Sequence, residues 1–154
     1  MVGTMERVLR TPEDIDAWAE YLKVRQLPLR VSAFAAGRVR TDDQNRCLHA
    51  WCGEVAEYYG DQTLMEVKAF VKLAFGVPVL CHANPAFAAK WESLASVMTY
   101  EQKLEVMAPP VELPVTSIMN TKQLSQVLDA TRLFYLRQGI ALTPEDKYYE
   151  TQTR

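Results

Sequence analysis

The sequence predicts one α+β domain in which a small sheet packs with about five to six helices. Runs of apolar residues at helical spacing, opened by capping residues and closed near glycines, cover most of the chain. A shorter stretch, residues 29–36, alternates in side-chain character as a strand does. No repeat, low-complexity tract or linker divides the 154 residues, so a single domain is expected to span residues 1–154.

The N-terminal elements are predicted to be a strand, a helix and a second strand. Residues 6–10 form the first candidate strand, and Thr11 then caps a helix that has Pro12 at its first position. The second strand, residues 29–36, ends at Gly37. This second strand is expected to lead directly into the longest helix of the domain.

Four later helices begin with one local pattern, in which a Thr or Asn cap is followed three positions later by Glu or Gln. The pairs are Thr41 and Gln44, Thr63 and Glu66, Thr99 and Gln102, and Asn120 and Gln123. Three of these helices have a glycine near their end, at Gly60, Gly76 and Gly139. Between these helices, residues 77–81 predict a short strand and residues 85–97 predict a helix. Residues 143–154 are polar and are expected to fray.

Composition and charge narrow the functional classes. An apolar content of 49% and a charged content of 23% are ordinary for a soluble globular protein, and no apolar run is long enough to span a membrane. Three cysteines without a preceding signal peptide predict reduced thiols and a location in the cytoplasm. The net charge of −2 argues against a broad nucleic-acid-coating surface. Residues 23–46 nevertheless hold more basic than acidic side chains, which is compatible with a local contact to one nucleic-acid strand.

The most informative segment, residues 38–46, brings arginines and an adjacent amide pair to a predicted strand-to-helix junction. Gln44 fits the position that caps a helix through the capping box. Helical spacing also places it on the apolar stripe of its helix, with Asn45 beside it at the rim, where amides need hydrogen-bond partners. Those partners are either a neighbouring backbone or a base edge, and both alternatives stay open. The candidate nucleic-acid-contacting residues are Arg38, Arg40, Gln44, Asn45, Arg46 and His49.

No metal site or cofactor is predicted. His49 and Cys52 share a helix face, and Cys81 is followed by His82, but zinc prefers closely spaced ligand pairs that this chain lacks. A small thiol on an apolar stripe is normally part of the core.

Catalysis also lacks positive support, so the protein is predicted not to be an enzyme. The alternative is a metal-dependent nuclease that uses Asp42, Asp43 or Glu54. However, acids in a first helical turn are favoured by the helix dipole without any catalytic role. No phosphate-binding loop or nucleophile motif is present.

Two further groups of side chains are candidates for contacts. Several aromatic residues have the chemistry to stack on bases, although their spacing is mostly that of a core. They are Trp51, Tyr58, Tyr59, Trp91 and Tyr100. On the last long helix, Leu133 and Leu136 point away from the apolar stripe, near Arg137. Leucines on a polar face indicate a protein contact, such as a dimer, and a pure interaction module is a third alternative.

Two blocks of the sequence carry motifs of a known family. The first is residues 40–48, where an arginine and a Thr-x-x-Gln-Asn run open an amphipathic helix. The second is the Thr-Ser-x-Met run of residues 116–119, followed by a helix that ends at Gly139 and by an acidic step at residues 143–145. Together these blocks resemble the NinB (Orf) recombination-mediator family of lambda-type phages. The resemblance extends over roughly residues 28–146, with the middle unmatched. His49 stands where the family has an aromatic residue.

The resemblance implies a small homodimeric protein of a bacteriophage or prophage that binds single-stranded DNA. It also implies that the protein contacts the host single-strand-binding protein and so assists recombinase loading during DNA recombination. Gln44 and Asn45 match the amide pair of the family, and Arg40 matches the preceding arginine. Residues 116, 117 and 119 match the second run. We therefore expect a non-enzymatic, single-stranded-DNA-binding recombination mediator.

Overall fold

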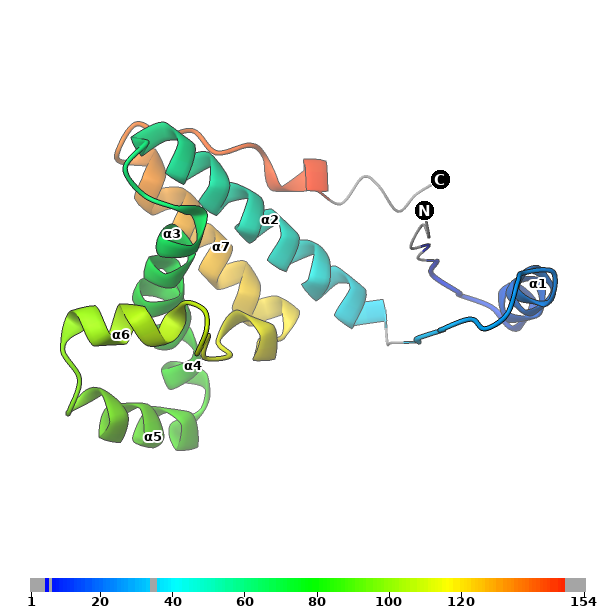
Figure 1. The fold of residues 1–154 in the computed structure, drawn as a ribbon, viewed down its shortest axis with the longest axis horizontal. Helices are drawn as coiled ribbons and strands as arrows, with labels where there is room; N and C mark the ends of the chain where they lie inside the picture. Colours follow the sequence, from blue (N-terminus) through cyan, green and yellow to red (C-terminus); the bar gives the residue numbers. More distant parts are fainter. Residues whose placement is uncertain (1–4, 6, 34–35, 149–154) are drawn as a thin grey trace.

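The computed structural model describes residue 5, residues 7–33 and residues 36–148, with the side chains of residues 36–40 left out. Every regular element in these ranges is helical, and they contain no strand (Figure 1). The fold is therefore all-α, and the prediction of an α+β domain with a small sheet is wrong. The elements are α1 (Pro12–Lys23), α2 (Ala36–Tyr59), α3 (Leu64–Val71), the π-helical turn η1 (Lys72–Gly76), α4 (Val77–Ala83), α5 (Pro85–Ala95), α6 (Tyr100–Met107), the 3-10 turn η2 (Thr116–Ile118), α7 (Thr121–Leu136) and the 3-10 turn η3 (Glu145–Tyr148).

The predicted strands fail for identifiable reasons. Residues 7–10 and 29–33 have no regular structure, residues 6 and 34–35 lie outside the described part, and Ala36 already belongs to α2. Alternating side chains suit an extended chain, but a strand also requires a neighbour with which to share backbone hydrogen bonds. No described segment offers one, so the alternation at residues 29–33 marks an extended arm.

The third predicted strand, residues 77–81, is helix α4, because the chain does not stop at Gly76. A π-helical turn joins α3 to α4, and Pro78 sits in the first turn of α4, where a missing N–H is tolerated. Gly76 therefore does not end a helix, and its lack of a side chain matters for packing instead. A Cβ atom placed there would lie 2.6 Å from Cγ1 of Val115, so this glycine permits close packing of the loop after α6.

Most of the predicted helix starts are confirmed. Thr11, Thr63, Thr99 and Asn120 each cap a helix, with complete capping boxes at α1, α3, α6 and α7. The predicted start at Thr41 is wrong, because α2 begins at Ala36 and no cap forms at Thr41. Residues 38–46 thus belong to a continuous helix rather than to a strand-to-helix junction.

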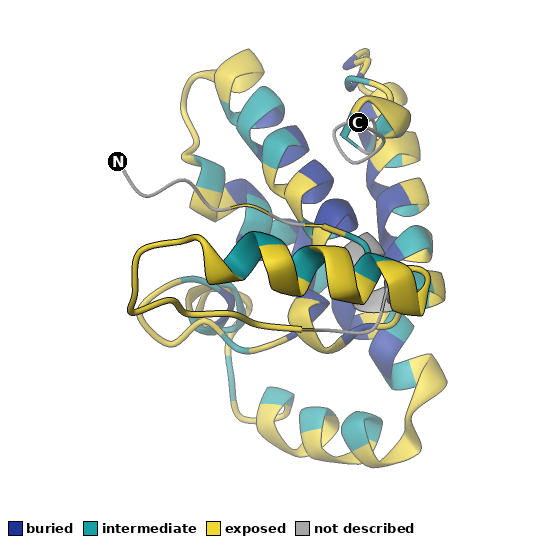
Figure 2. Ribbon diagram, turned by 90° about the vertical axis from the view of Figure 1, so that its right-hand side faces the viewer, coloured by how far each residue is buried: buried dark blue, intermediate teal, exposed yellow. Residues whose placement is uncertain are grey.

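The core lies where α2 and α7 run side by side and α3 crosses them (Figures 1 and 2). Trp51 of α2 is fully enclosed, and Leu124 and Leu128 of α7 are equally buried. Helix α7 ends just before Gly139, whose φ of 84° favours glycine, as the predicted C-terminal stop requires. No helix in the described ranges has both the length and the apolar character needed to cross a bilayer.

The segment after α7 returns along α2 and is held by side chains of that helix. Trp51 Nε1 donates a hydrogen bond to the Thr143 carbonyl oxygen at 2.7 Å. Glu54 accepts from the Thr143 backbone N–H at 3.0 Å and from the Tyr148 hydroxyl at 3.1 Å. Residues 143–148, expected to fray, are therefore fastened to α2, while residues 149–154 lie outside the described part.

Candidate functional site

Gln44 joins two helices and does not reach the surface. Its side chain is 0% exposed, and its Nε2 atom donates to the Thr121 carbonyl oxygen at 3.2 Å and to Ser125 Oγ at 2.8 Å. Its Oε1 atom has no hydrogen-bond partner among the described residues. Beside it, the hydroxyls of Thr41 and Thr121 lie 3.2 Å apart. We call this contact between α2 and α7 the Gln44 seam, and its burial removes Gln44 from any ligand-facing surface.

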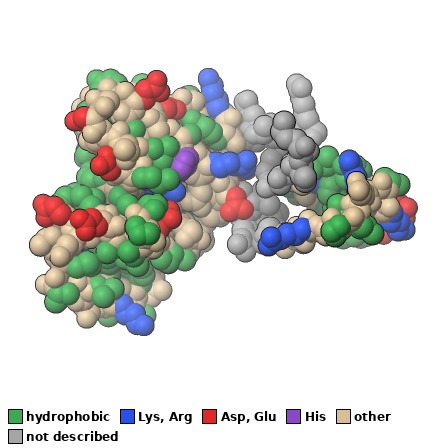
Figure 3. Space-filling model, viewed as in Figure 1, with side chains coloured by type: hydrophobic (Ala, Val, Ile, Leu, Met, Phe, Trp, Pro, Cys, Tyr) green, Lys and Arg blue, Asp and Glu red, His purple; other side chains and the backbone are tan. Residues whose placement is uncertain are grey.

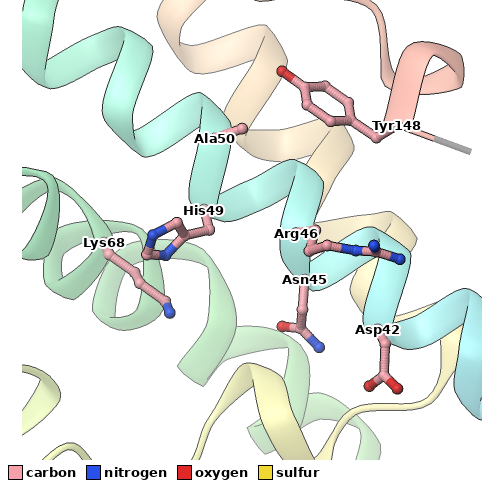
Figure 4. Close-up of a pocket in the computed structure, with 7 residues that line it drawn as sticks. All are labelled: Asp42, Asn45, Arg46, His49, Ala50, Lys68 and Tyr148. Atoms are coloured by element: carbon pink, nitrogen blue, oxygen red, sulfur yellow. The ribbon is translucent and has the colours of Figure 1, made fainter. Parts of the chain in front are cut away.

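Asn45 and His49 occupy the adjacent, open side of α2. Both project toward Lys68 of α3, while Arg46 extends in another direction (Figure 4). Asn45 is half-buried, and its Nδ2 atom donates to the Thr41 carbonyl oxygen at 3.1 Å, which holds the amide at the helix edge. His49 is exposed. Two of the predicted site residues therefore face a common space, and Lys68 was not among the residues predicted.

That space is a cleft with two adjoining hollows, of about 490 and 350 Å³, which share Asn45 and Lys68. We call it the Lys68 cleft. Helices α2 and α3, the turn η1, the loop after α6 and the C-terminal turn η3 form its walls. The lining residues are Asp42, Asn45, Arg46, His49, Ala50, Lys68, Lys72, Glu112, Leu113, Pro114, Val115, Thr116, Ser117 and Tyr148. Volumes of this size are those of typical ligand clefts, roughly 300–1,000 Å³.

Two lysines supply cations to the cleft. The Lys68 ammonium makes no hydrogen bond or ion pair with a described residue, so it is available to a ligand. Lys72 is only 3% exposed, and its Nζ atom donates to the Met107 carbonyl oxygen at 2.9 Å. Burial lowers the pKa of Lys72, an effect that nearby Glu112 opposes and Lys68 reinforces. Charged residues at helical spacing usually mark a solvated face, so no pattern in the sequence predicts that these two lysines lie near Asn45.

The cleft unites the two sequence blocks. Asn45 comes from the first block, and Thr116 and Ser117 come from the second, on the short turn η2. Ser117 is exposed, whereas Thr116 and Met119 are buried. The second block is thus divided between the core and the rim, with Ser117 at the rim.

Of the three predicted arginines, the structure describes the side chain of Arg46 alone. The side chains of Arg38 and Arg40 lie outside the described part of the chain, so the structure does not test their predicted role. Arg46 forms an ion pair with Asp43, three residues earlier in α2, and about half of its side chain is exposed. Arg46 therefore lines the cleft as a cation that is partly neutralised.

The acids suggested for a nuclease have other surroundings. Asp43 is buried beside Arg46, and Glu54 fastens the segment after α7. Asp42 is exposed at the edge of the cleft. Within the described residues no three His, Cys, Asp or Glu side chains converge as a metal site would require.

The cysteines and most of the aromatic residues belong to packing. Cys47 and Cys52 are buried, and burial raises the pKa of each thiol from 9.0 to about 12. Trp51 is enclosed and hydrogen-bonded, and Trp91 is half-buried on α5. Tyr58, Tyr59 and Tyr100 are exposed and do not line the cleft.

Charge on this side of the molecule is mixed. Figure 3 shows Lys and Arg side chains interspersed with Asp and Glu, without one continuous basic surface. The charges that line the cleft are also mixed, because Arg46, Lys68 and Lys72 are accompanied by the acids Asp42 and Glu112. The chain matches no protein-family model, no curated protein and no solved structure.

Proposed function

We propose that the protein binds single-stranded DNA in the Lys68 cleft and acts as a recombination mediator without catalysing a reaction. The observation that carries this proposal is the meeting of Asn45, Lys68 and Ser117 in one cleft. Together these side chains offer an amide, an ammonium and a hydroxyl. An amide presents a donor and an acceptor to a base edge, and an ammonium neutralises a phosphate.

A single strand suits this cleft better than a duplex. Bases of a single strand can turn outward and enter a hollow, where they stack on flat side chains and bond through their edges. His49 supplies a flat, exposed ring beside Asn45. The mixed charge predicts binding that is local and moderate in strength, because few phosphates are neutralised at once.

The proposed biological role comes from the resemblance to the NinB family, which the cleft complements. In that role the protein acts in the host cytoplasm and contacts the host single-strand-binding protein as well as DNA. Gln44, the family's other amide, would support the site from beneath, because it fixes α2 against α7 one residue before Asn45. Gln44 would then support the helix while Asn45 alone contacts DNA, in place of the expectation that both amides touch DNA.

Fluorescence anisotropy with a labelled oligothymidine tests the proposal. Lys68→Ala is expected to weaken binding by about fivefold or more and to reduce the slope of log K against log salt by roughly 0.7, the loss of one phosphate contact on a single strand. Lys90→Ala is the matched control, because Lys90 is an exposed lysine on α5 that does not line the cleft.

The two variants separate the site from the function. Equal weakening by Lys68→Ala and Lys90→Ala would mean that DNA is held by general surface charge. An absence of binding by the unmodified protein, at low salt and with folding verified, would remove DNA binding itself. Tighter binding of duplex than of single-stranded DNA would contradict the strand preference.

A further inference from the structure

Helix α1 carries an apolar stripe that the rest of the described chain does not cover. Ile15, Trp18 and Leu22 lie on one side of the helix by their spacing, and Ile15 is 56% exposed. None of the twelve residues of α1 is buried. In Figure 2 this helix faces the viewer, and it shows exposed and intermediate residues along its whole length. Trp18 and Leu22 are half-buried, and Trp18 stacks on Tyr21 of the same helix at 4.8 Å between ring centroids. The guanidinium of Arg7 also lies over the Trp18 ring, 5.9 Å from its centroid.

A helix of this length is marginally stable alone. Helices shorter than about 12–15 residues rarely persist in water without tertiary contacts. The capping box at Thr11 and the proline at the first turn support α1 but leave its apolar stripe in water. The helix thus requires an apolar surface to cover that stripe.

Helix α7 offers such a surface on its outer side. Leu133 and Leu136 are 47% and 51% exposed, on the side away from the buried Leu124 and Leu128. The exposure of the two leucines confirms that they point away from the apolar stripe, whereas the protein contact predicted for them and Arg137 stays a prediction. A pair of neighbouring leucines on an otherwise polar helix face is a usual anchor for an amphipathic helix.

The charges of the two surfaces are complementary. The polar side of α1 carries four acids and one lysine. They are Glu13, Asp14, Asp16, Glu20 and Lys23. The exposed side of α7 and its C-cap carry three basic residues and one acid, namely Lys122, Arg132, Arg137 and Asp129. Opposite charges around an apolar contact favour its register and its rate of formation.

We propose that α1 packs on the outer face of α7 in a second copy of the chain, so that two copies exchange N-terminal arms. The positions of the elements favour a second copy. Figure 1 places α1 beyond the N-terminal end of α2, at the opposite end of the molecule from the C-terminal end of α7. To reach the α7 of its own chain, α1 would have to turn back along the length of α2. A second copy presents its α7 to an arm that already extends outward.

Complementation between two variants tests the exchange, with mass measured by sedimentation velocity. Ile15→Asp disables the arm and Leu133→Asp disables the receiving face, and both positions are exposed enough to leave the folded body intact. Leu94→Asp, at an exposed leucine of α5, is the matched control. The unmodified protein and the control are expected to have twice the 17.5 kDa chain mass, and each disabled variant is expected to be a monomer.

Mixing the two disabled variants gives the decisive result. The mixture is expected to regain dimers, because one intact arm then meets one intact face, with an affinity about a hundredfold or more below that of the unmodified protein. A monomeric unmodified protein would overturn the proposal, as would a dimer that survives either substitution. A mixture that stays monomeric would also overturn it, since an arm bound to its own α7 or a direct α7 to α7 contact gives no complementation.

Discussion

Gln44 and Asn45 are consecutive in the sequence, yet they belong to two regions with different physical roles. In the Gln44 seam, a fully buried amide donates to two groups of α7. In the Lys68 cleft, a half-buried amide at the helix edge meets Lys68 and Ser117 across an open hollow. The side of α2 on which a polar group lies therefore decides its role. We expect seam residues to govern stability and cleft residues to govern binding.

The largest effect is expected from Gln44→Ala. The substitution opens a cavity and removes the hydrogen bonds that Gln44 donates to the partly buried Thr121 carbonyl and Ser125 hydroxyl, so the free energy of unfolding should fall by about 3 kcal/mol. Urea denaturation followed by circular dichroism measures it. The DNA affinity of the folded protein should stay within about twofold of the original. A large loss of affinity with full stability would reverse the roles given to the two regions.

Alkaline pH is expected to lower the free energy of unfolding through two buried thiols of α2. Burial raises the pKa of Cys47 and Cys52 from 9.0 to about 12, so the unfolded chain loses these protons at lower pH than the folded one. The resulting stabilisation is complete below pH 9 and is lost as the pH rises toward 12. Between pH 8 and 10 the loss should be about 2 kcal/mol, partly offset by the lowered pKa of Lys72.

Denaturation of Cys47→Ala/Cys52→Ala over the same pH range isolates this contribution. The double variant starts from lower stability because it loses core volume. Its stability should nevertheless change less with pH. An unchanged slope would show that the thiols are not the source of the pH dependence.

Gly76→Ala tests how the core fixes one wall of the cleft. The new methyl group would lie 2.6 Å from the side chain of Val115, which lines the cleft, so Val115 must move. We expect a loss of about 1–2 kcal/mol in unfolding free energy, which is the usual cost of overpacking. Val115→Ala alone is also destabilising, but in the double variant the clash disappears. A double-mutant cycle without coupling between the two positions would contradict the contact.

The smallest effect on stability is expected from Asn45→Ala, although its effect on binding is the more informative one. Only the hydrogen bond to the Thr41 carbonyl oxygen is lost, and alanine favours helix, so the unfolding free energy should change by about 0.5 kcal/mol or less. The affinity for oligothymidine should fall about fivefold, equivalent to about 1 kcal/mol. Anisotropy and denaturation on the same sample compare it directly with Gln44→Ala.

The features that the sequence predicts well are local. Capping boxes at Thr63, Thr99 and Asn120 depend on residues three positions apart, and all three form as predicted. The strand at residues 29–36 and the cap at Thr41 fail because residues outside each local pattern decide the outcome. One requires a partner strand, and the other is overridden by a helix that already began at Ala36.

The candidate site could be predicted only in part, because only some of its residues carry a local signal in the sequence. Asn45 and His49 carry a local sign, an amide and an imidazole at the rim of an apolar stripe, and both line the cleft. Lys68 and Lys72 join them only through the crossing of α3 over α2 and the π-helical turn that follows. No spacing within the sequence encodes that meeting.

Backbone amide chemical-shift mapping tests the central claim most directly. Isotope-labelled protein would be titrated with oligothymidine and followed by two-dimensional nuclear magnetic resonance. We expect the largest shifts at Asn45, His49, Lys68 and Ser117, while residues on the outer face of α7, such as Leu133, remain unchanged. Shifts centred on another face, with the cleft residues unmoved, would contradict it.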